Sequence, residues 1–275
     1  MKIGFLGSGN MARSLGHRLK TSAPNIQQYF YSPSGTKARQ LAVEVQGTFV
    51  ASLDDFPNDM DILFLAFKPQ MLNEAKLPKI STKTIIVSLL AAISIEKLEA
   101  QYLDQKIVRL MPNTPSEIGL GVLPYVLGNK LIGNSHDQVL ISQLLSFFGQ
   151  GLLVEKDQDL EILTPYTGCL PGMLYYFFDL LQKDLKTNLD QHQVHSLKDV
   201  NTEKVMMNVI KGIVDLYFHH KTLKLHELQA QVTSKGGLTE QAILSLKNDE
   251  LEKMIRNSIE SAMIRSSELN KLINQ

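Results

Sequence analysis

Short apolar runs separated by helical patterns fill the first 156 residues of the chain. The runs cover residues 3–6, 26–31, 48–51, 61–66, 84–89 and 106–110, and two further candidate strands cover 122–126 and 152–154. In the run at 61–66, every residue after Asp61 is apolar, which is typical of a strand covered on both faces. Strands that alternate with helices predict an α/β fold with a doubly wound, mostly parallel sheet.

The pattern changes after residue 157, where no segment reads as a strand. Apolar residues recur at helical spacing, for example at Leu174, Phe178 and Leu181, and again along residues 251–273. We therefore predict two domains, an α/β domain over residues 1–156 and an all-helical domain over 157–275. Periodicity alone leaves open whether the helical stripes pack on one another or against a second copy of the chain.

Composition excludes several classes of protein. The formal net charge is zero, so nothing suggests a nucleic-acid partner. No apolar run approaches about 18 residues, so we expect no membrane span. Cys169 is the single cysteine, which excludes an internal disulfide framework. The first strand begins at the N-terminus and leaves no room for a signal peptide, so we expect a cytoplasmic protein.

The first candidate site is the sequence Gly7-Ser8-Gly9-Asn10-Met11-Ala12, which follows the first strand and opens a helix. Gly7 permits the tight turn, and Gly9 allows the backbone to approach a pyrophosphate. Ala12 keeps the helix close to the sheet, and the helix N-terminus presents N–H groups to the negative charge. The alternative is a glycine turn in an ordinary α/β domain. The context favours dinucleotide binding in a Rossmann-like domain.

The end of the second strand carries no carboxylate. An NAD-specific site places an acidic residue there to accept from the ribose 2′-OH. This chain has no Asp or Glu before Glu44, and it carries Ser32, Ser34 and Lys37, with Arg39 close by. Hydroxyls and cations suit a 2′-phosphate, so the pattern favours NADPH and leaves NADH open. The alternative is a solvated turn that caps the next helix.

Four stretches together resemble the pyrroline-5-carboxylate reductase family. They are residues 7–12, the sequence Phe67-Lys68-Pro69-Gln70, residues 109–115 (Arg-Leu-Met-Pro-Asn-Thr-Pro), and residues 232–239 (Val-Thr-Ser-Lys-Gly-Gly-Leu-Thr). The resemblance implies reduction of 1-pyrroline-5-carboxylate to proline with NAD(P)H. It also implies a nucleotide-binding domain followed by a helical domain that forms a homodimer, often assembled further into a decamer.

The resemblance also implies roles for individual residues. The cofactor would contact Gly7, Ser8, Gly9, Asn10, Met11, Ser32, Ser34, Lys37, Ala66, Phe67, Lys68, Pro69 and Asn113. The substrate would contact Ser234, Gly236, Gly237, Leu238 and Thr239, with Thr239 as the catalytic residue hydrogen-bonded to the ring nitrogen. From the residues alone, the glycine pair exposes N–H groups that suit a carboxylate. The alternative is a plain turn with Thr239 as a helix N-cap.

Residues 167–173 depart from the family. The family segment Ser-Gly-Ser-Gly-Pro-Ala-Tyr appears here as Thr-Gly-Cys-Leu-Pro-Gly-Met, and the loop proline is replaced by Lys235. These changes keep two alternatives open, a regulatory NADPH-binding paralogue without activity and a reductase of another cyclic imine. A β-hydroxyacid dehydrogenase is disfavoured, because the second half has no suitable lysine and asparagine pair. We interpret Cys169 as a buried packing residue and expect no metal site.

Overall fold

The computed structural model describes residues 1–273 of the chain. Its contacts divide these residues into two compact units. The first unit contains Met1–Cys169 together with the residues from Ser261 onward, and the second contains Leu170–Glu260. The boundary predicted after residue 156 differs from this division of contacts, which falls after Cys169, and it stays a prediction.

Within residues 1–273, eight strands form one sheet in the order β3-β2-β1-β4-β5-β6-β7-β8. They are β1 (Lys2–Leu6), β2 (Gln27–Tyr31), β3 (Thr48–Phe49), β4 (Ile62–Leu65), β5 (Ile85–Ser88), β6 (Lys106–Leu110), β7 (Gly121–Leu127) and β8 (Gly149–Leu153). Strands β1 to β6 run parallel, while β7 pairs antiparallel with β6. The predicted doubly wound, mostly parallel sheet is confirmed. Its strand order reverses between β1 and β4, where such sheets bind ligands.

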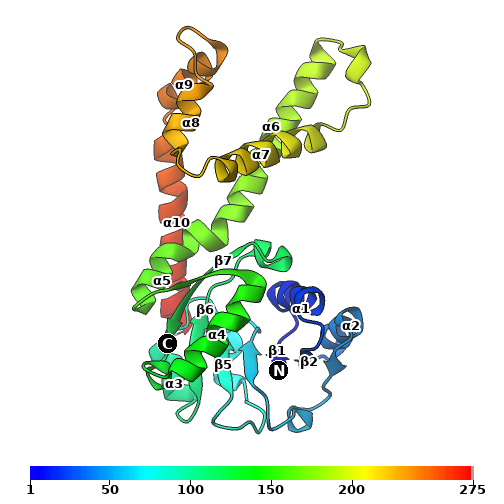
Figure 1. Ribbon diagram of the computed structural model, residues 1–275, viewed down its shortest axis with the longest axis vertical. Helices are drawn as coiled ribbons and strands as arrows, with labels where there is room; N and C mark the ends of the chain where they lie inside the picture. The colour runs from blue at the N-terminus through cyan, green and yellow to red at the C-terminus, as the bar shows by residue number, and fades with distance from the viewer. Residues whose placement is uncertain (274–275) are drawn as a thin grey trace. The chain divides into compact units, whose positions relative to one another are not determined.

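Helices cover both faces of this sheet (Figure 1). Helices α1 (Asn10–Ser22), α2 (Thr36–Val45) and α4 (Ser135–Phe148) contribute to one buried apolar cluster. The 3₁₀ helix η2 (Pro69–Glu74) and helices α3 (Ile95–Gln101) and α5 (Asp157–Thr164) contribute to the other. Short 3₁₀ turns complete the unit: η1 (Leu53–Asp55), η3 (Thr114–Ile118) and η4 (Asn129–Leu131).

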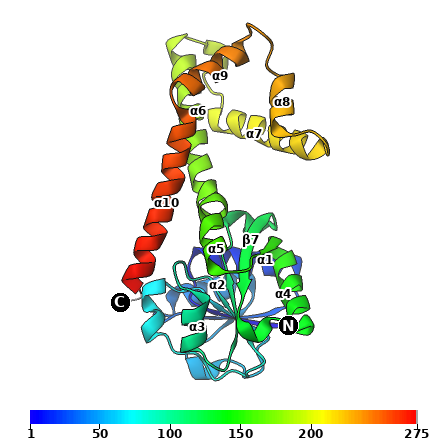
Figure 2. The same cartoon turned by 90° about the vertical axis from the view of Figure 1, so that its left-hand side faces the viewer.

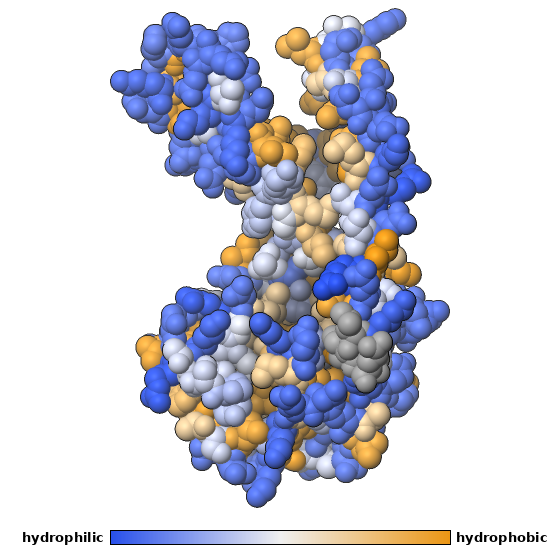
Figure 3. Space-filling view, turned by 180° about the vertical axis from the view of Figure 1, so that it is seen from behind, coloured by the Kyte–Doolittle hydropathy of each residue, from blue (hydrophilic) through white to orange (hydrophobic). Residues whose placement is uncertain are grey.

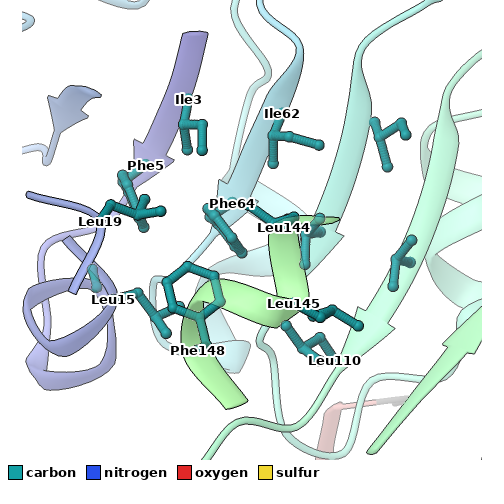
Figure 4. Close-up of a cluster of buried hydrophobic side chains, with 14 of the residues drawn as sticks. Ile3, Phe5, Leu15, Leu19, Ile62, Phe64, Leu110, Leu144, Leu145 and Phe148 are labelled. Carbon is teal, nitrogen blue, oxygen red and sulfur yellow. The ribbon is translucent and has the colours of Figure 1, made fainter. Parts of the chain in front are cut away.

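The strand β4 shows why its sequence is apolar throughout. All four of its residues are buried, and Phe64 packs in the cluster beneath α1 and α4, whereas Leu63 and Leu65 pack in the opposite cluster. Phe5 of β1 stacks between Phe30 and Phe64, with ring centroids 4.9 and 4.8 Å away. Figure 4 shows Phe5 and Phe64 converging with side chains of α1 and α4. A parallel strand inside a doubly wound sheet must fill both layers.

A buried ion-pair network holds β6 to the neighbouring helices. Arg109 is 2% exposed, and its Nη1 donates to Asp157 Oδ1 at 2.7 Å. Its Nη2 donates to Glu161, whose other oxygen accepts from Ser266 Oγ at 2.5 Å. The second oxygen of Asp157 accepts the N–H of Ile95 at 2.6 Å. One guanidinium therefore joins β6, α3, α5 and the last part of α10 (Leu251–Ile273).

The second unit consists of helices, as the sequence predicts. They are α6 (Leu170–Gln191), the 3₁₀ turn η6 (His195–Leu197), α7 (Thr202–His219), α8 (Leu225–Gln231), α9 (Leu238–Asn248) and the part of α10 up to Glu260. Helix α7 packs beside α6, and Thr202 Oγ1 donates to Gln182 Oε1 at 2.9 Å (Figure 2). A π-helical turn, Pro165–Cys169, precedes α6 in the first unit.

Apolar stripes of this helical unit are open to solvent in the single chain. Among the described residues of the unit, Ile259 is the only hydrophobic residue that is buried, with 6% of its surface exposed. Val209, Ile213 and Leu216 follow helical spacing on α7 and are 52%, 63% and 49% exposed. Figure 3 shows apolar side chains on the surface of these helices. The stripes therefore do not form an internal core within the described residues of this unit.

The buried network yields a stability prediction. Asp157→Ala leaves Arg109 without one carboxylate and Ile95 N–H without its acceptor, so we expect a loss of about 3–5 kcal/mol of unfolding free energy. Urea denaturation at one fixed protein concentration measures it. The control is Glu252→Ala, which breaks the exposed Glu252–Arg256 pair (2.9 Å) and should cost no more than about 0.5 kcal/mol. Equal losses in the two variants would contradict the structural role of the network.

Candidate functional site

Three strand ends meet at the turn after β1. The N–H of Gly7 donates to the carbonyl of Tyr31 at 2.8 Å, and the N–H of Ala66 donates to the carbonyl of Leu6 at 2.7 Å. The ends of β1, β2 and β4 are thereby tied together. The structure thus brings the predicted cofactor residues of 7–11, 32–37 and 66–69 to one edge of the sheet. This edge is the carboxyl end of the parallel strands, beside the reversal of strand order.

The two glycines of the turn have different surroundings. Gly7 has a φ of +102°, and a Cβ there would lie 2.4 Å from the carbonyl oxygen of Ala66. Gly9 has a φ of −78°, and its Cβ would meet only that same oxygen, at 3.9 Å. The tight approach of β1 to β4 therefore requires Gly7. Gly9 instead leaves an open space in front of the N-terminus of α1.

This helix N-terminus has unsatisfied donors. Gly9 is the N-cap and has no side chain to accept a hydrogen bond. The first hydrogen bond within the helix runs from the N–H of Arg13 to the carbonyl oxygen of Gly9, at 3.0 Å. The N–H groups of the first turn therefore have no acceptor within the helix. In the described part of the chain, the buried Ser8 Oγ has no hydrogen-bond partner either. A concentration of free donors at a helix N-terminus suits a phosphate.

A cavity of about 690 Å³ lies beyond the end of β2. Ser32, Ser34, Thr36 and Arg39 line it, and within the described residues the buried Ser32 Oγ has no partner. The Arg39 guanidinium stacks over the Phe49 ring, 4.4 Å from its centroid. Free hydroxyls and a guanidinium fit a phosphate ester. Sequence reasoning favoured Lys37 as the cation, but Arg39 is the basic residue that lines the cavity.

One carboxylate also lines this cavity, and the sequence did not reveal it. Glu44 of α2 forms an ion pair with Arg13 at 3.0 Å and a hydrogen bond with His17 Nε2 at 3.0 Å. The His17 hydrogen bond is the main reason that the pKa of Glu44 lies below its ordinary value. The negative charge of Glu44 is therefore compensated by Arg13 and His17, which belong to the same unit.

The remaining predicted cofactor residues follow β4 and β6. Ala66 and Phe67 are half-buried at the end of β4, and Lys68 is exposed in an extended conformation before η2. Asn113 follows β6 and is 7% exposed. Its Nδ2 donates to the Thr167 carbonyl at 3.0 Å, and its Oδ1 accepts from Val122 N–H at 3.1 Å. Asn113 thus joins its loop to β7 and to the π-helical turn, a role that sequence reasoning missed.

The predicted substrate loop lies in the second unit, before α9. Gly236 has a φ of +73°, and Gly237 N–H donates to the Ser234 carbonyl at 2.9 Å. We expected both glycine N–H groups to be free, and this is wrong for the single chain. Gly236 N–H donates to Glu240 Oε2 at 2.7 Å. Leu238 and Thr239 occupy the first turn of α9, where N–H groups have no acceptor within the helix.

Thr239 is exposed and is not the N-cap. Gly237 is the N-cap and makes no side-chain capping bond, so the alternative reading of Thr239 as a cap is wrong. Leu238 is 92% exposed. The loop therefore presents the Thr239 hydroxyl and the free N–H groups of the first turn of α9. The substrate-binding assignments to Ser234–Thr239 stay predictions.

Three other expectations concern Cys169, a metal site and a membrane span. Cys169 is exposed in the chain, so the interpretation of a buried packing residue is wrong. His192, His195, His219 and His226 are exposed. Among the described residues, no cluster of three or more His, Cys, Asp or Glu side chains could hold a metal ion. Within residues 1–273, no helix has the length and apolar composition needed to cross a membrane.

Comparisons with known proteins cover the whole chain. Residues 157–269 match the family model for pyrroline-5-carboxylate reductase dimerisation, and residues 2–92 match the model for NADP oxidoreductase, coenzyme F420-dependent. The pyrroline-5-carboxylate reductase of Staphylococcus saprophyticus is 30% identical over 285 residues, which cover 98% of each chain. That of Vibrio alginolyticus is 24% identical, again over 98% of each chain.

Solved structures show the same fold. The crystal structure of Plasmodium falciparum pyrroline carboxylate reductase, with NADP bound, superimposes with a TM-score of 0.79 at 25% identity and covers 98% of each chain. The 1-pyrroline-5-carboxylate reductase of Streptococcus pyogenes has a TM-score of 0.80 at 22% identity, over 97% of this chain and 98% of that one.

The two glycines of the first turn yield a prediction. Gly7→Ala forces a side chain into a left-handed conformation and against the Ala66 carbonyl, so we expect a loss of about 2–3 kcal/mol of unfolding free energy or more. Gly9→Ala meets no close neighbour and should cost at most about 1 kcal/mol, as a substitution at an N-cap. Thermal denaturation of both variants measures the difference. Similar losses in the two variants would contradict the conclusion that the close approach of β1 to β4 requires a glycine at position 7.

Proposed function

Because the chain belongs to the pyrroline-5-carboxylate reductase family of NAD(P)-dependent oxidoreductases, we propose that it reduces 1-pyrroline-5-carboxylate to proline with NADPH. The observation that carries this proposal is the glycine loop before α9, which presents the Thr239 hydroxyl and free backbone donors at its surface. The family similarity extends over both halves of the chain. The first unit would bind the nucleotide, and residues 157–275 would bind the substrate and form the dimer.

The carboxyl edge of the sheet is the proposed nucleotide site. Gly9 and the first turn of α1 would hold the pyrophosphate, with Ser8 as a further donor. Ser32, Ser34 and Arg39 would hold the 2′-phosphate, and Lys37 adds positive charge nearby. Glu44 is engaged by Arg13 and His17, so it is not free to accept from a ribose 2′-OH. Ala66–Pro69 and Asn113 would lie beside the nicotinamide riboside. NADPH supplies the hydride.

The chain's own contribution to the reaction is positioning and charge. A cyclic imine already accepts hydride readily when its nitrogen is protonated or hydrogen-bonded. The Thr239 hydroxyl would bond to the ring nitrogen. The N–H groups of Leu238 and Thr239 would receive the substrate carboxylate, because they are among the donors that α9 leaves free. This assignment moves the carboxylate from the N–H groups of Gly236 and Gly237, which the sequence suggested, to those of Leu238 and Thr239.

We propose a homodimer formed through the helical unit. Its apolar stripes on α6 and α7 are exposed in the single chain, and residues 157–269 match a dimerisation family. A homodimer would bury those stripes and supply the core that the unit lacks. A decamer and a cytoplasmic location stay predictions.

The proposal is tested by steady-state oxidation of NADPH and NADH with 1-pyrroline-5-carboxylate and with 1-pyrroline and its six-membered homologue. We expect turnover of the carboxylated imine, with NADPH preferred over NADH. The departures in residues 167–173 favour one second candidate, a regulatory NADPH-binding protein. Tight NADPH binding without turnover of any imine would support that candidate and overturn the proposed activity.

The role of Thr239 gives a separate prediction. Thr239→Ala removes the hydroxyl that would bond to the ring nitrogen, so kcat should fall about 10- to 100-fold, as for a lost hydrogen bond to a charged group. NADPH affinity, followed by fluorescence titration, should change less than about twofold. Thr239→Ser keeps a hydroxyl and should retain most of the turnover. An equal loss of NADPH binding in Thr239→Ala would argue against the assigned role.

The dimer can be tested on α7. Ile213→Glu places a charge on an exposed apolar stripe, which costs several kcal/mol if that stripe is buried in a dimer. We expect light scattering to show a shift from dimer to monomer. Asn208→Asp is the control, because Asn208 is an exposed polar residue on the same helix. A dimer that persists in Ile213→Glu at low micromolar concentration would exclude this stripe as the interface.

A further inference from the structure

The glycine loop already holds a carboxylate that belongs to the chain itself. The side chain of Glu240 folds back over the N-terminus of α9, and its Oε2 accepts the N–H of Gly236 at 2.7 Å. Gly237 N–H is used by the Ser234 carbonyl. The internal carboxylate thus takes the only glycine N–H that the turn itself does not use. A substrate carboxylate needs donors of the same kind within the same loop.

This contact has an electrostatic consequence for a ligand. The donors that α9 leaves free include the N–H groups of Leu238 and Thr239, which immediately precede Glu240 in the chain. An anionic substrate bound there would lie close to the negative charge of Glu240, and two like charges a few ångströms apart repel each other even in water. The substrate carboxylate must therefore either bind beside Glu240 at a cost or displace it from Gly236. A ring without a carboxylate meets neither cost.

We propose that Glu240 is a specificity-determining residue that weakens the binding of carboxylated imines relative to imines without a carboxylate. The inference rests on the proposed function, because it concerns the same substrate loop. Glu240 is not a catalytic residue, since it acts on the carboxylate of the substrate and not on the imine bond. It sets how strongly the loop distinguishes 1-pyrroline-5-carboxylate from 1-pyrroline.

A second glutamate in the same unit separates this role from ordinary helix capping. Glu227 of α8 accepts the N–H of Lys224 at 2.6 Å, which is the same kind of contact at another helix N-terminus. Glu227 is not part of the substrate loop. If Glu240 only stabilises its helix, removing the charge of either glutamate should have the same effect on substrate binding. If it also repels an anion, only Glu240 should affect the substrate.

The experiment compares Glu240→Gln with Glu227→Gln in the full chain. Glutamine keeps an oxygen that can accept the backbone N–H and removes the charge. For Glu240→Gln we expect the KM for 1-pyrroline-5-carboxylate to fall about fourfold to tenfold, the size of one removed repulsion near the surface, with kcat nearly unchanged. The KM for 1-pyrroline should stay within twofold, and Glu227→Gln should change neither KM. An unchanged KM for the carboxylated imine, or equal changes for both imines, overturns the inference.

A binding measurement keeps the test independent of turnover. L-Proline and pyrrolidine share the ring and the ammonium group and differ in the carboxylate, so their dissociation constants can be compared by titration calorimetry in the presence of NADP⁺. Glu240→Gln should tighten proline binding and leave pyrrolidine unchanged or weaker. If the protein reduces neither imine, the proposed function fails, and this titration still decides the role of Glu240. No change in proline binding would overturn that role.

Discussion

The buried guanidinium of Arg109 is the interaction on which the arrangement of the first unit depends. A charge removed from water is costly, and it is tolerated only where both ends of the guanidinium find anionic partners. Asp157 and Glu161 supply them, and each carboxylate also accepts a second hydrogen bond, from Ile95 N–H and from Ser266. Three helices are thereby positioned around β6. The loop that carries Asn113 begins directly after this strand.

The carboxyl edge of the sheet shows the opposite situation, polar groups left without partners. Ser8 Oγ and Ser32 Oγ are buried in the described chain with no hydrogen-bond partner, although buried polar groups are usually paired. Both lie beside turns that Gly7 and Tyr31 hold together. Unsatisfied donors next to a helix N-terminus and a cavity are the features expected of a site built for a phosphate-bearing ligand.

The helical unit leaves apolar rather than polar groups without partners in the single chain. It buries almost none of its apolar stripes in the single chain, and exposed apolar surface of this kind is typical of a protein–protein interface. The loop proposed to bind the substrate also differs from a simple anion receptor, because Glu240 and Ser234 occupy the two glycine N–H groups. The donors that stay free belong to the first turn of α9, which shifts the proposed ligand position toward Leu238 and Thr239.

The strands, the helical second half, the glycine turn and the family were predictable from the sequence, because periodicity and short motifs act over a few neighbouring residues. The partners of Arg109 lie 48 and 52 positions away, and the pairing of Glu44 with His17 spans 27, so only the tertiary structure could reveal them. Likewise, the choice of Arg39 over Lys37 and the exposure of Cys169 depend on packing between elements. Glu240 is local in sequence, but its contact depends on the left-handed turn at Gly236, which only the folded backbone defines.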